Sequence, residues 1–328
     1  MIGGEWSEAE ESFEVRSPYS GEVIAEVASA AEGAFAEALG AATEAAEKMR
    51  SLPRFRIAGG LRKISEGIAA RSDELTRTIA LESAKPVIYA RGEVQRAVST
   101  FAFAASEAER FSGEMVPLDT QPNGKGKTGF SLRVPRGVIY GITPFNFPLN
   151  LVAHKVAPAL AAGNSIIIKP SPRTPLTALL LGEIFLESGL PKPALQIVPM
   201  DTKYIDLVYD DDRIKMISFT GSDKVGWDLK SKAGRKAVAL ELGGNAPAIV
   251  DETADVEEAV KGAGQGQRWD TSDMTRTSDR TSSPWASLGV RGAFDGEEAQ
   301  QNSSRVPQEP HGSAPPYGLD TGFRATRV

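Results

Sequence analysis

The 328-residue sequence contains no cysteine, and this absence excludes several kinds of site. A disulfide scaffold, a thiolate metal site and a cysteine nucleophile within this chain are all ruled out. Histidine is scarce as well, since His154 and His311 are the only two. Neither has a partner at the spacing of a zinc site, so we expect no bound metal. With only two histidines in the sequence, few positions could supply the base of a Ser–His–Asp triad.

A basic excess and a long apolar run are also missing. Lys and Arg total 37 against 43 Asp and Glu, a net charge of −6, whereas proteins that bind nucleic acid or anionic membranes usually carry a positive excess. No stretch approaches the roughly 18 apolar residues of a membrane span. The first residues lack a basic segment followed by an apolar one. We expect a cytoplasmic protein that binds neither nucleic acid nor membranes.

The residues that are present have the composition of a folded protein, with 41% hydrophobic and 24% charged. In the first part, 1–29, alternating residues of Phe13–Val27 flank a Pro-Tyr-Ser-Gly turn and predict a β-hairpin arm. The second part, 30–129, has apolar residues at helical spacing and predicts three or four amphipathic helices. Most of their charged side chains are expected to face solvent.

The third part, 130–263, alternates short apolar strands with helices. Strands are predicted at 137–141, 165–169, 194–198 and 215–219, and helices at 149–162, 175–188, 204–209 and 223–233. This alternation indicates a doubly wound α/β domain whose parallel sheet is covered on both faces. Such sheets bind ligands at the carboxyl ends of their strands.

The last part, 264–328, differs abruptly from the rest. It is rich in Ser, Thr, Gly and Pro, is poor in large apolar residues, and contains neither lysine nor isoleucine. This composition predicts disorder. A natural linker would explain it, but a shift of reading frame explains better why the change falls inside an apparent helix beginning at Asp255.

Four segments follow predicted strands and carry candidate functional groups. In Ile142–Leu149 the Asn146 amide could stabilise an oxyanion, or serve only as a turn residue. Lys169, at the end of a buried strand, could reach a cofactor hydroxyl or phosphate, or simply meet solvent. The turn at Gly221 and Ser222 opens a helix whose N–H groups could bind phosphate, or is an ordinary N-cap.

The fourth segment places Glu241 in an apolar strand, before Gly243 and Gly244. Burial would raise its pKa toward the working range of a general base. The alternative is a structural hydrogen bond from this carboxylate to a neighbouring loop.

Taken together, Pro-Phe-Asn-Phe-Pro, Lys-Pro-Ser, Phe-Thr-Gly-Ser and Glu-Leu-Gly-Gly, in this order and spacing, closely resemble the aldehyde dehydrogenase superfamily over about residues 1–263. The resemblance implies oxidation of a small aldehyde through a cysteine thioester, with NAD or NADP taking the hydride. It also implies a homo-oligomer. The residues within these motifs are most similar to those of the branches that oxidise lactaldehyde, semialdehydes or glyceraldehyde phosphate.

The resemblance also implies roles for individual residues. Asn146 would hold the oxyanion and Glu241 would activate water. Lys169 would contact the adenosine ribose, and Ser222 with the Gly221 region would meet the pyrophosphate. The remaining expected cofactor contacts are Ile142, Thr143, Pro144 and Phe145 along the channel, Leu242 and Gly243 beside the nicotinamide, and Ser171, Pro172, Phe219 and Val225.

The sequence departs from the family pattern in two places. Gly266-Gln267-Arg268 resembles the family's cysteine context, but Trp269 stands where the cysteine belongs. The rest of the catalytic domain and the usual oligomerisation segment also have no counterpart here. Many NAD-preferring relatives carry a glutamate where Pro172 stands, so NADP is permitted and the choice stays open.

Three interpretations follow. The first is an NAD(P)-dependent aldehyde dehydrogenase by descent, truncated and inactive as given. The second is a non-catalytic dinucleotide-binding or interaction protein that uses the intact half. A third, a relative that reduces activated acids, also needs a cysteine and shares the defect of the first.

Overall fold

The computed structural model describes residues 1–7, 9, 11–244, 251, 253–255 and 257–260. The described residues divide into two compact units, the first within residues 1–243 and the second within residues 244–260. In the second unit, a helical turn covers residues 257–260, and the Ala259 N–H donates to the Asp255 carbonyl at 2.9 Å. The predicted tail at 264–328 lies outside the described residues.

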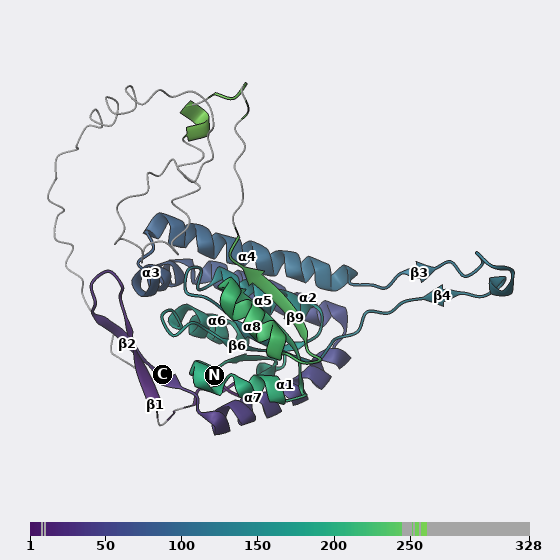
Figure 1. Cartoon of the computed structure of the whole chain (residues 1–328), viewed down its shortest axis with the longest axis horizontal. Helices are drawn as coiled ribbons and strands as arrows, with labels where there is room; N and C mark the ends of the chain where they lie inside the picture. The colour runs from purple at the N-terminus through teal and green to yellow at the C-terminus, as the bar shows by residue number, and fades with distance from the viewer. Residues whose placement is uncertain (8, 10, 245–250, 252, 256, 261–328) are drawn as a thin grey trace. The chain divides into compact units, whose positions relative to one another are not determined.

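The first unit is built on a five-stranded parallel sheet, which confirms the predicted α/β fold (Figure 1). Its strand order is β7-β6-β5-β8-β9. The strands are β5 (Val138–Ile142), β6 (Ser165–Lys169), β7 (Leu195–Ile197), β8 (Ile214–Gly221) and β9 (Ala237–Leu242). The chain runs from the central β5 outward to β7, then returns beside β5 with β8. The order therefore reverses between β5 and β8, where doubly wound sheets bind their ligands.

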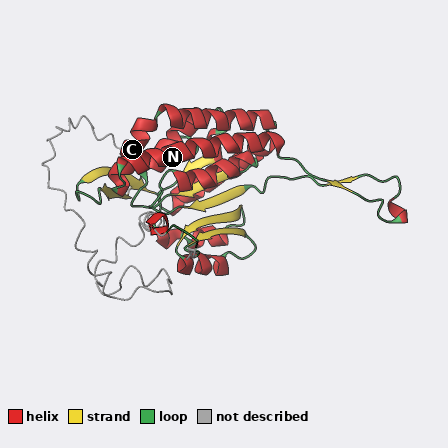
Figure 2. Cartoon of the chain, turned by 90° about the horizontal axis from the view of Figure 1, so that it is seen from above, coloured by secondary structure: helices red, strands yellow, loops and turns green. Residues whose placement is uncertain are grey.

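Helices cover both faces of this sheet (Figure 2). On one face lie α5 (Asn150–Ala161) and α6 (Leu176–Leu186), backed by the predicted amphipathic helices α2 (Arg54–Ala70), α3 (Ser72–Ser83) and α4 (Val87–Arg110). The other face is covered by α1 (Glu32–Ser51), α7 (Asp206–Asp210) and α8 (Asp223–Lys232). Because both faces are covered, the central strands are buried, and β6 is buried at every residue. No helix of the described part is both long and apolar enough to cross a membrane.

Two antiparallel hairpins complete the unit. The predicted N-terminal hairpin is present as β1 (Glu11–Arg16) and β2 (Val23–Ser29). The sequence did not predict the second, which pairs β3 (Met115–Val116) with β4 (Gly129–Phe130) and extends away from the sheet in Figures 1 and 2. Short 3-10 turns lie at Pro122–Gly124, Lys192–Ala194 and Thr202–Tyr204.

Two adjacent glycines of α2 should respond in opposite directions to alanine. A Cβ at Gly60 would lie 2.5 Å from Cγ of the buried Leu190, whereas a Cβ at Gly59 would meet nothing within 4 Å. Gly60→Ala should therefore lower the free energy of unfolding by about 1–3 kcal/mol through overpacking. Gly59→Ala should raise it by about 0.5–1 kcal/mol, because alanine favours the helix. Urea denaturation of both variants measures the contrast, and equal effects would refute the α2–Leu190 packing.

Candidate functional site

The four predicted segments meet at one edge of the sheet. Ile142 ends β5 and is paired in register with Lys169 of β6 and Phe219 of β8. On the far side of β8, Gly221 is paired with Leu242 of β9. The carboxyl ends of β6, β5, β8 and β9 therefore lie side by side, as the sequence predicted for parallel neighbours.

The loop after β5 is anchored by a buried ion pair that the sequence did not reveal. Glu93 of α4 accepts hydrogen bonds from the Leu149 and Asn150 N–H groups at 2.9 and 3.1 Å. Its second carboxylate oxygen binds the ammonium of Lys85. Lys85 in turn donates to the carbonyl oxygen of Asn146 at 2.7 Å. The backbone of Asn146 and the start of α5 are thus both held by the helical layer.

The side chain of Asn146 has unused hydrogen-bonding capacity. Its Oδ1 is buried and has no hydrogen-bond partner among the described residues. Buried polar atoms without partners are uncommon in folded proteins. An amide held by its backbone, with its own polar atoms unengaged, fits a group that meets a ligand. At the start of the same loop, the Thr143 N–H donates to the Lys169 carbonyl at 3.2 Å and ties β5 to β6.

Lys169 is a buried cation with nothing to bind in the described structure. The residue is 5% exposed, and its ammonium makes no hydrogen bond or ion pair with the described residues. Burial lowers the pKa of Lys169, while the negative charge of Asp201 acts in the opposite direction. An ammonium without an acceptor suits a hydroxyl or phosphate oxygen, and contact of Lys169 with a cofactor stays a prediction. Ser171 follows and accepts the Thr174 N–H in a turn at 3.1 Å, with Pro172 exposed at its tip.

The turn from β8 into α8 brings backbone close to β9. Ser222 is the N-cap residue, with φ −69° and ψ 148°, and its side chain makes no capping hydrogen bond. The Gly226 N–H closes the first turn on the Ser222 carbonyl at 3.0 Å. A Cβ at Gly226 would lie 2.3 Å from a terminal methyl of Leu242, so a larger residue there would require the Leu242 side chain to move. Val225 is half exposed beside this turn, while Phe219 is buried in the preceding strand.

The expectation of a buried Glu241 is wrong for the described structure. Glu241 lies in β9, the edge strand, and is exposed. An edge strand has a neighbour on one side only, so an apolar sequence does not by itself bury every side chain of the strand. The described part therefore does not supply the burial on which the predicted general base depends.

Lys155 of α5 is a polar group at this edge that the sequence analysis missed. It is 5% exposed, and its Nζ donates to Ser218 Oγ at 3.1 Å and Thr220 Oγ1 at 2.8 Å. Burial lowers its pKa to about 8, and the Glu241 carboxylate opposes that shift. Because Thr220 is paired in register with Glu241, Lys155 lies on the side of the sheet edge that Glu241 also influences. The only signal in the sequence is one lysine within a helix of small apolar residues.

Comparison with known proteins gives a consistent result. The model of the aldehyde dehydrogenase family matches residues 6–272. The chain is 39% identical over 261 residues to a 3-sulfolactaldehyde dehydrogenase of Priestia aryabhattai, covering 79% of this chain and 54% of the relative.

Two solved structures are similar in fold as well as sequence. The aldehyde dehydrogenase 21 of Physcomitrella patens, in complex with its reaction product succinate, has a TM-score of 0.76 at 39% identity, covering 80% of this chain and 55% of that one. A glyceraldehyde-3-phosphate dehydrogenase of Methanocaldococcus jannaschii complexed with NADP has a TM-score of 0.73 at 35% identity, covering 78% and 56%. The chain thus spans about half the length of the relatives it matches.

Proposed function

Because the chain belongs to the aldehyde dehydrogenase family, we propose that its described part is the dinucleotide-binding portion of an NAD(P)-dependent enzyme that oxidises aldehydes. Lys169 carries the proposal. The residue is 5% exposed, its ammonium makes no hydrogen bond or ion pair with the described residues, and it lies in the row of strand ends where doubly wound sheets bind nucleotides. The relative of known structure that is complexed with NADP supports the same assignment.

The residues present fit the cofactor chemically. Lys169 would donate to ribose oxygens, and the N–H groups at the start of α8 would face the pyrophosphate. The close approach at Gly226 keeps this turn free of side-chain bulk next to β9. NAD(P), when bound, would accept a hydride from the substrate carbon. With Pro172 in the place of an acid, nothing there repels a 2′-phosphate, so we expect NADP to bind at least as well as NAD.

Aldehyde oxidation by this chain is a separate matter, because the sequence contains no cysteine. We propose that Asn146 would stabilise an oxyanion and that Glu241 would serve as the base in a full-length relative. In this chain no thioester can form on a cysteine, so we expect no acid product. The named relatives handle sulfonate-, carboxylate- or phosphate-bearing compounds, and an aldehyde with an acidic group is the substrate class we propose.

Titration of the full chain with NADPH and with NADH, followed by nicotinamide fluorescence, tests dinucleotide binding. Lys169→Met should weaken binding at least about tenfold, a loss of ~1.4 kcal/mol, because hydrogen bonds from a charged donor are lost. Lys48→Met, at an exposed lysine of α1, should change nothing. No binding by the unaltered chain, or equal binding by the Lys169 variant, would contradict the proposal.

The second candidate is a dinucleotide-binding or interaction protein with no catalytic role, and the absence of cysteine favours it. The same preparation distinguishes the two ideas. Aldehyde-dependent formation of NADPH would exclude the non-catalytic role. Dinucleotide binding without turnover would support it.

A further inference from the structure

Two helices that begin beside the candidate site do not cap themselves. The N-cap residue of α5 is Leu149 and that of α6 is Pro175, and neither makes a side-chain capping hydrogen bond. The first N–H groups of each helix therefore need acceptors from elsewhere in the fold. Both acceptors are buried carboxylates, Glu93 of α4 for the start of α5 and Glu82 of α3 for the start of α6.

Glu82 uses both of its carboxylate oxygens on the start of α6. Oε2 accepts the Leu176 N–H at 2.8 Å, and Oε1 accepts the Thr177 N–H at 3.1 Å together with the Thr177 hydroxyl. Protonation places a hydrogen on one of these oxygens, which then no longer accepts as a carboxylate oxygen does. Only the charged form of Glu82 can therefore hold both N–H groups at once.

The start of α6 is also the far end of the loop that follows β6. This loop leaves the sheet after Lys169 and consists of residues 170–175 alone. Within it, the Thr174 N–H donates to the Ser171 carbonyl at 3.1 Å, and Thr174 is 2% exposed. So short a connection passes a movement of the first turn of α6 on to the residues that are expected to contact the dinucleotide.

The corner between α3 and α4 separates the two capping carboxylates in the sequence. Ala84 in this corner has φ 53° and ψ 25°, a left-handed conformation that is unfavourable for residues other than glycine. Such a conformation persists where surrounding contacts fix the backbone. The next residue, Lys85, is held by Glu93 and by the Asn146 carbonyl. These contacts fix the corner, and with it the end of α3 that carries Glu82.

Burial and hydrogen bonding oppose each other at Glu82. Burial raises its pKa to about 7, the hydrogen bonds from Thr177 and Leu176 lower it, and the negative charge of Glu93 raises it again. Lys85, which carries the opposite charge, is engaged by Glu93. Both charge states of Glu82 are therefore populated near neutral pH.

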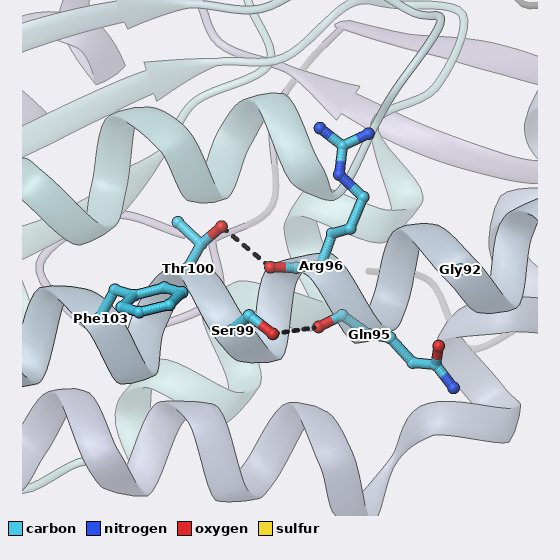
Figure 3. Close-up of a pocket in the computed structure, with 6 residues that line it drawn as sticks. All are labelled: Gly92, Gln95, Arg96, Ser99, Thr100 and Phe103. Atoms are coloured by element: carbon cyan, nitrogen blue, oxygen red, sulfur yellow. Dashed lines mark hydrogen bonds between the residues drawn. The ribbon is translucent and has the colours of Figure 1, made fainter.

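The other charged groups on the elements packed against α3 are paired elsewhere or exposed. Arg71 pairs with Glu183 at the opposite end of α3, and Arg91 of α4 pairs with Asp73. The charged side chains of α2 are exposed. On α4, Arg96 is exposed beside a shallow hollow of about 330 Å³ that is open to solvent (Figure 3). Among the described residues, none of these cations pairs with the capping carboxylate of α3.

We propose that Glu82 is a positioning residue of the dinucleotide site, and that its negative charge holds the loop after β6 in the geometry that binds NAD(P). The proposal rests on the proposed function and adds regulation of the same site. When Glu82 is charged, both N–H groups at the start of α6 are held and the loop after Lys169 keeps its far end. When Glu82 is protonated, one N–H group is released and the loop end can move. Dinucleotide affinity should therefore rise with pH as Glu82 loses its proton.

The charge of Glu82 has opposite effects on stability and on binding. A buried charge lowers stability, yet the charged form is the one with complete caps. Glu82→Gln mimics the protonated state, because its amide nitrogen donates and does not accept. At about pH 8 this variant should be more stable than the unaltered chain but should bind the dinucleotide more weakly. A residue with a merely structural role would move stability and affinity in the same direction.

Titration of the full chain with NADPH between about pH 6 and 8.5, followed by nicotinamide fluorescence, tests this role. The unaltered chain should bind about three- to tenfold more tightly at the upper limit, the effect of one hydrogen bond. Glu82→Gln should show the weaker affinity throughout. Glu74→Gln is the matched control on α3 and should keep the step, because Arg71 lowers the pKa of Glu74 and keeps it charged across this range. Ionisation of the ligand is common to all variants and cancels in the comparison.

A second variant identifies the titrating group. Thr177→Val removes the hydroxyl hydrogen bond, which lowers the pKa of Glu82, and leaves both N–H groups in place. The step in affinity should therefore move to higher pH and keep its height. A shift in this direction assigns the step to Glu82 rather than to Lys169, whose pKa is lowered by burial.

The outcomes separate this role from the proposed function. An affinity that is constant or falls with rising pH, or a step that persists in Glu82→Gln, would overturn the role of Glu82 and leave the proposed function standing. Absence of NADPH binding at every pH would contradict the proposed function and this role with it. NMR signals of the Leu176 and Thr177 N–H groups follow the caps without ligand, and their midpoint should coincide with that of the binding step.

Discussion

Replacing Glu93 with alanine should lower the free energy of unfolding by about 3–5 kcal/mol, the range for removing one partner of a buried ion pair. The Glu93 side chain is 0% exposed and Lys85 is 9% exposed, so the remaining ammonium would stay buried without its counter-charge. The N–H groups of Leu149 and Asn150 would also lose their acceptor. Urea denaturation monitored by circular dichroism measures the loss.

A surface ion pair on the same helix provides the control. Glu109 of α4 pairs with Arg62, and both side chains are 47% exposed. Glu109→Ala should cost less than about 1 kcal/mol, because solvent screens the pair. If Glu93→Ala were as mild as Glu109→Ala, the buried pair would not be holding the loop. Hydrogen exchange at Leu149 and Asn150 should accelerate in the Glu93 variant, because their N–H groups lose a buried acceptor.

The second large effect is a dependence of stability on pH through Glu82. This carboxylate of α3 is 1% exposed and accepts the Leu176 and Thr177 N–H groups at 2.8 and 3.1 Å, as well as the Thr177 hydroxyl. Burial raises its pKa from 4.5 to about 7, and the hydrogen bonds only partly offset this. Between these values the folded protein holds the proton more tightly than the unfolded chain. Its contribution to stability should therefore fall by roughly 3 kcal/mol as the pH rises from about 4.5 to 7.

Glu82→Gln isolates this contribution, because glutamine keeps the shape and the acceptor oxygen but does not titrate. Below pH 4.5 the variant should match the unaltered chain, and at pH 8 it should be the more stable of the two. Glu82→Ala should be less stable throughout, since the start of α6 loses its cap. Parallel stability curves for the glutamine variant and the unaltered chain would show that Glu82 titrates normally.

Most of the fold could be predicted from the sequence. The five residues Ser165–Lys169 form the predicted strand with the predicted ends, because an apolar run flanked by turns admits few alternatives. The β3–β4 ribbon was missed. Its strands have two residues each, too short for any periodicity to appear.

The sequence predicts which residues lie at the ends of the strands, because that follows from the order of the elements. It does not predict which side chains are buried, because burial depends on how the elements pack. Lys169 ends β6 as the sequence predicts, but its burial at 5% exposed is visible only in the packed structure. Glu82 and Glu93 look like solvent-facing charges of amphipathic helices, and only the position of α5 and α6 against them shows that they are buried. Glu241 is exposed because β9 is an edge strand, and the sequence does not reveal the position of β9 in the sheet.

The two buried glutamates, Glu82 and Glu93, connect the two segments of the first unit that differ in composition. Glu82 caps a helix that begins 94 residues later, and Glu93 accepts from an amide 56 residues later. Residues 30–129 and 130–263 look like separate modules by composition, yet the first supplies the caps that complete α5 and α6 of the second. Contacts between residues so distant in sequence form slowly, because the chain loses the entropy of loop closure before the contact contributes any stabilising free energy. Residues 130–263 therefore contain two helix starts whose acceptors, Glu93 and Glu82, lie outside that segment, so both segments must have been synthesised before either helix start is capped.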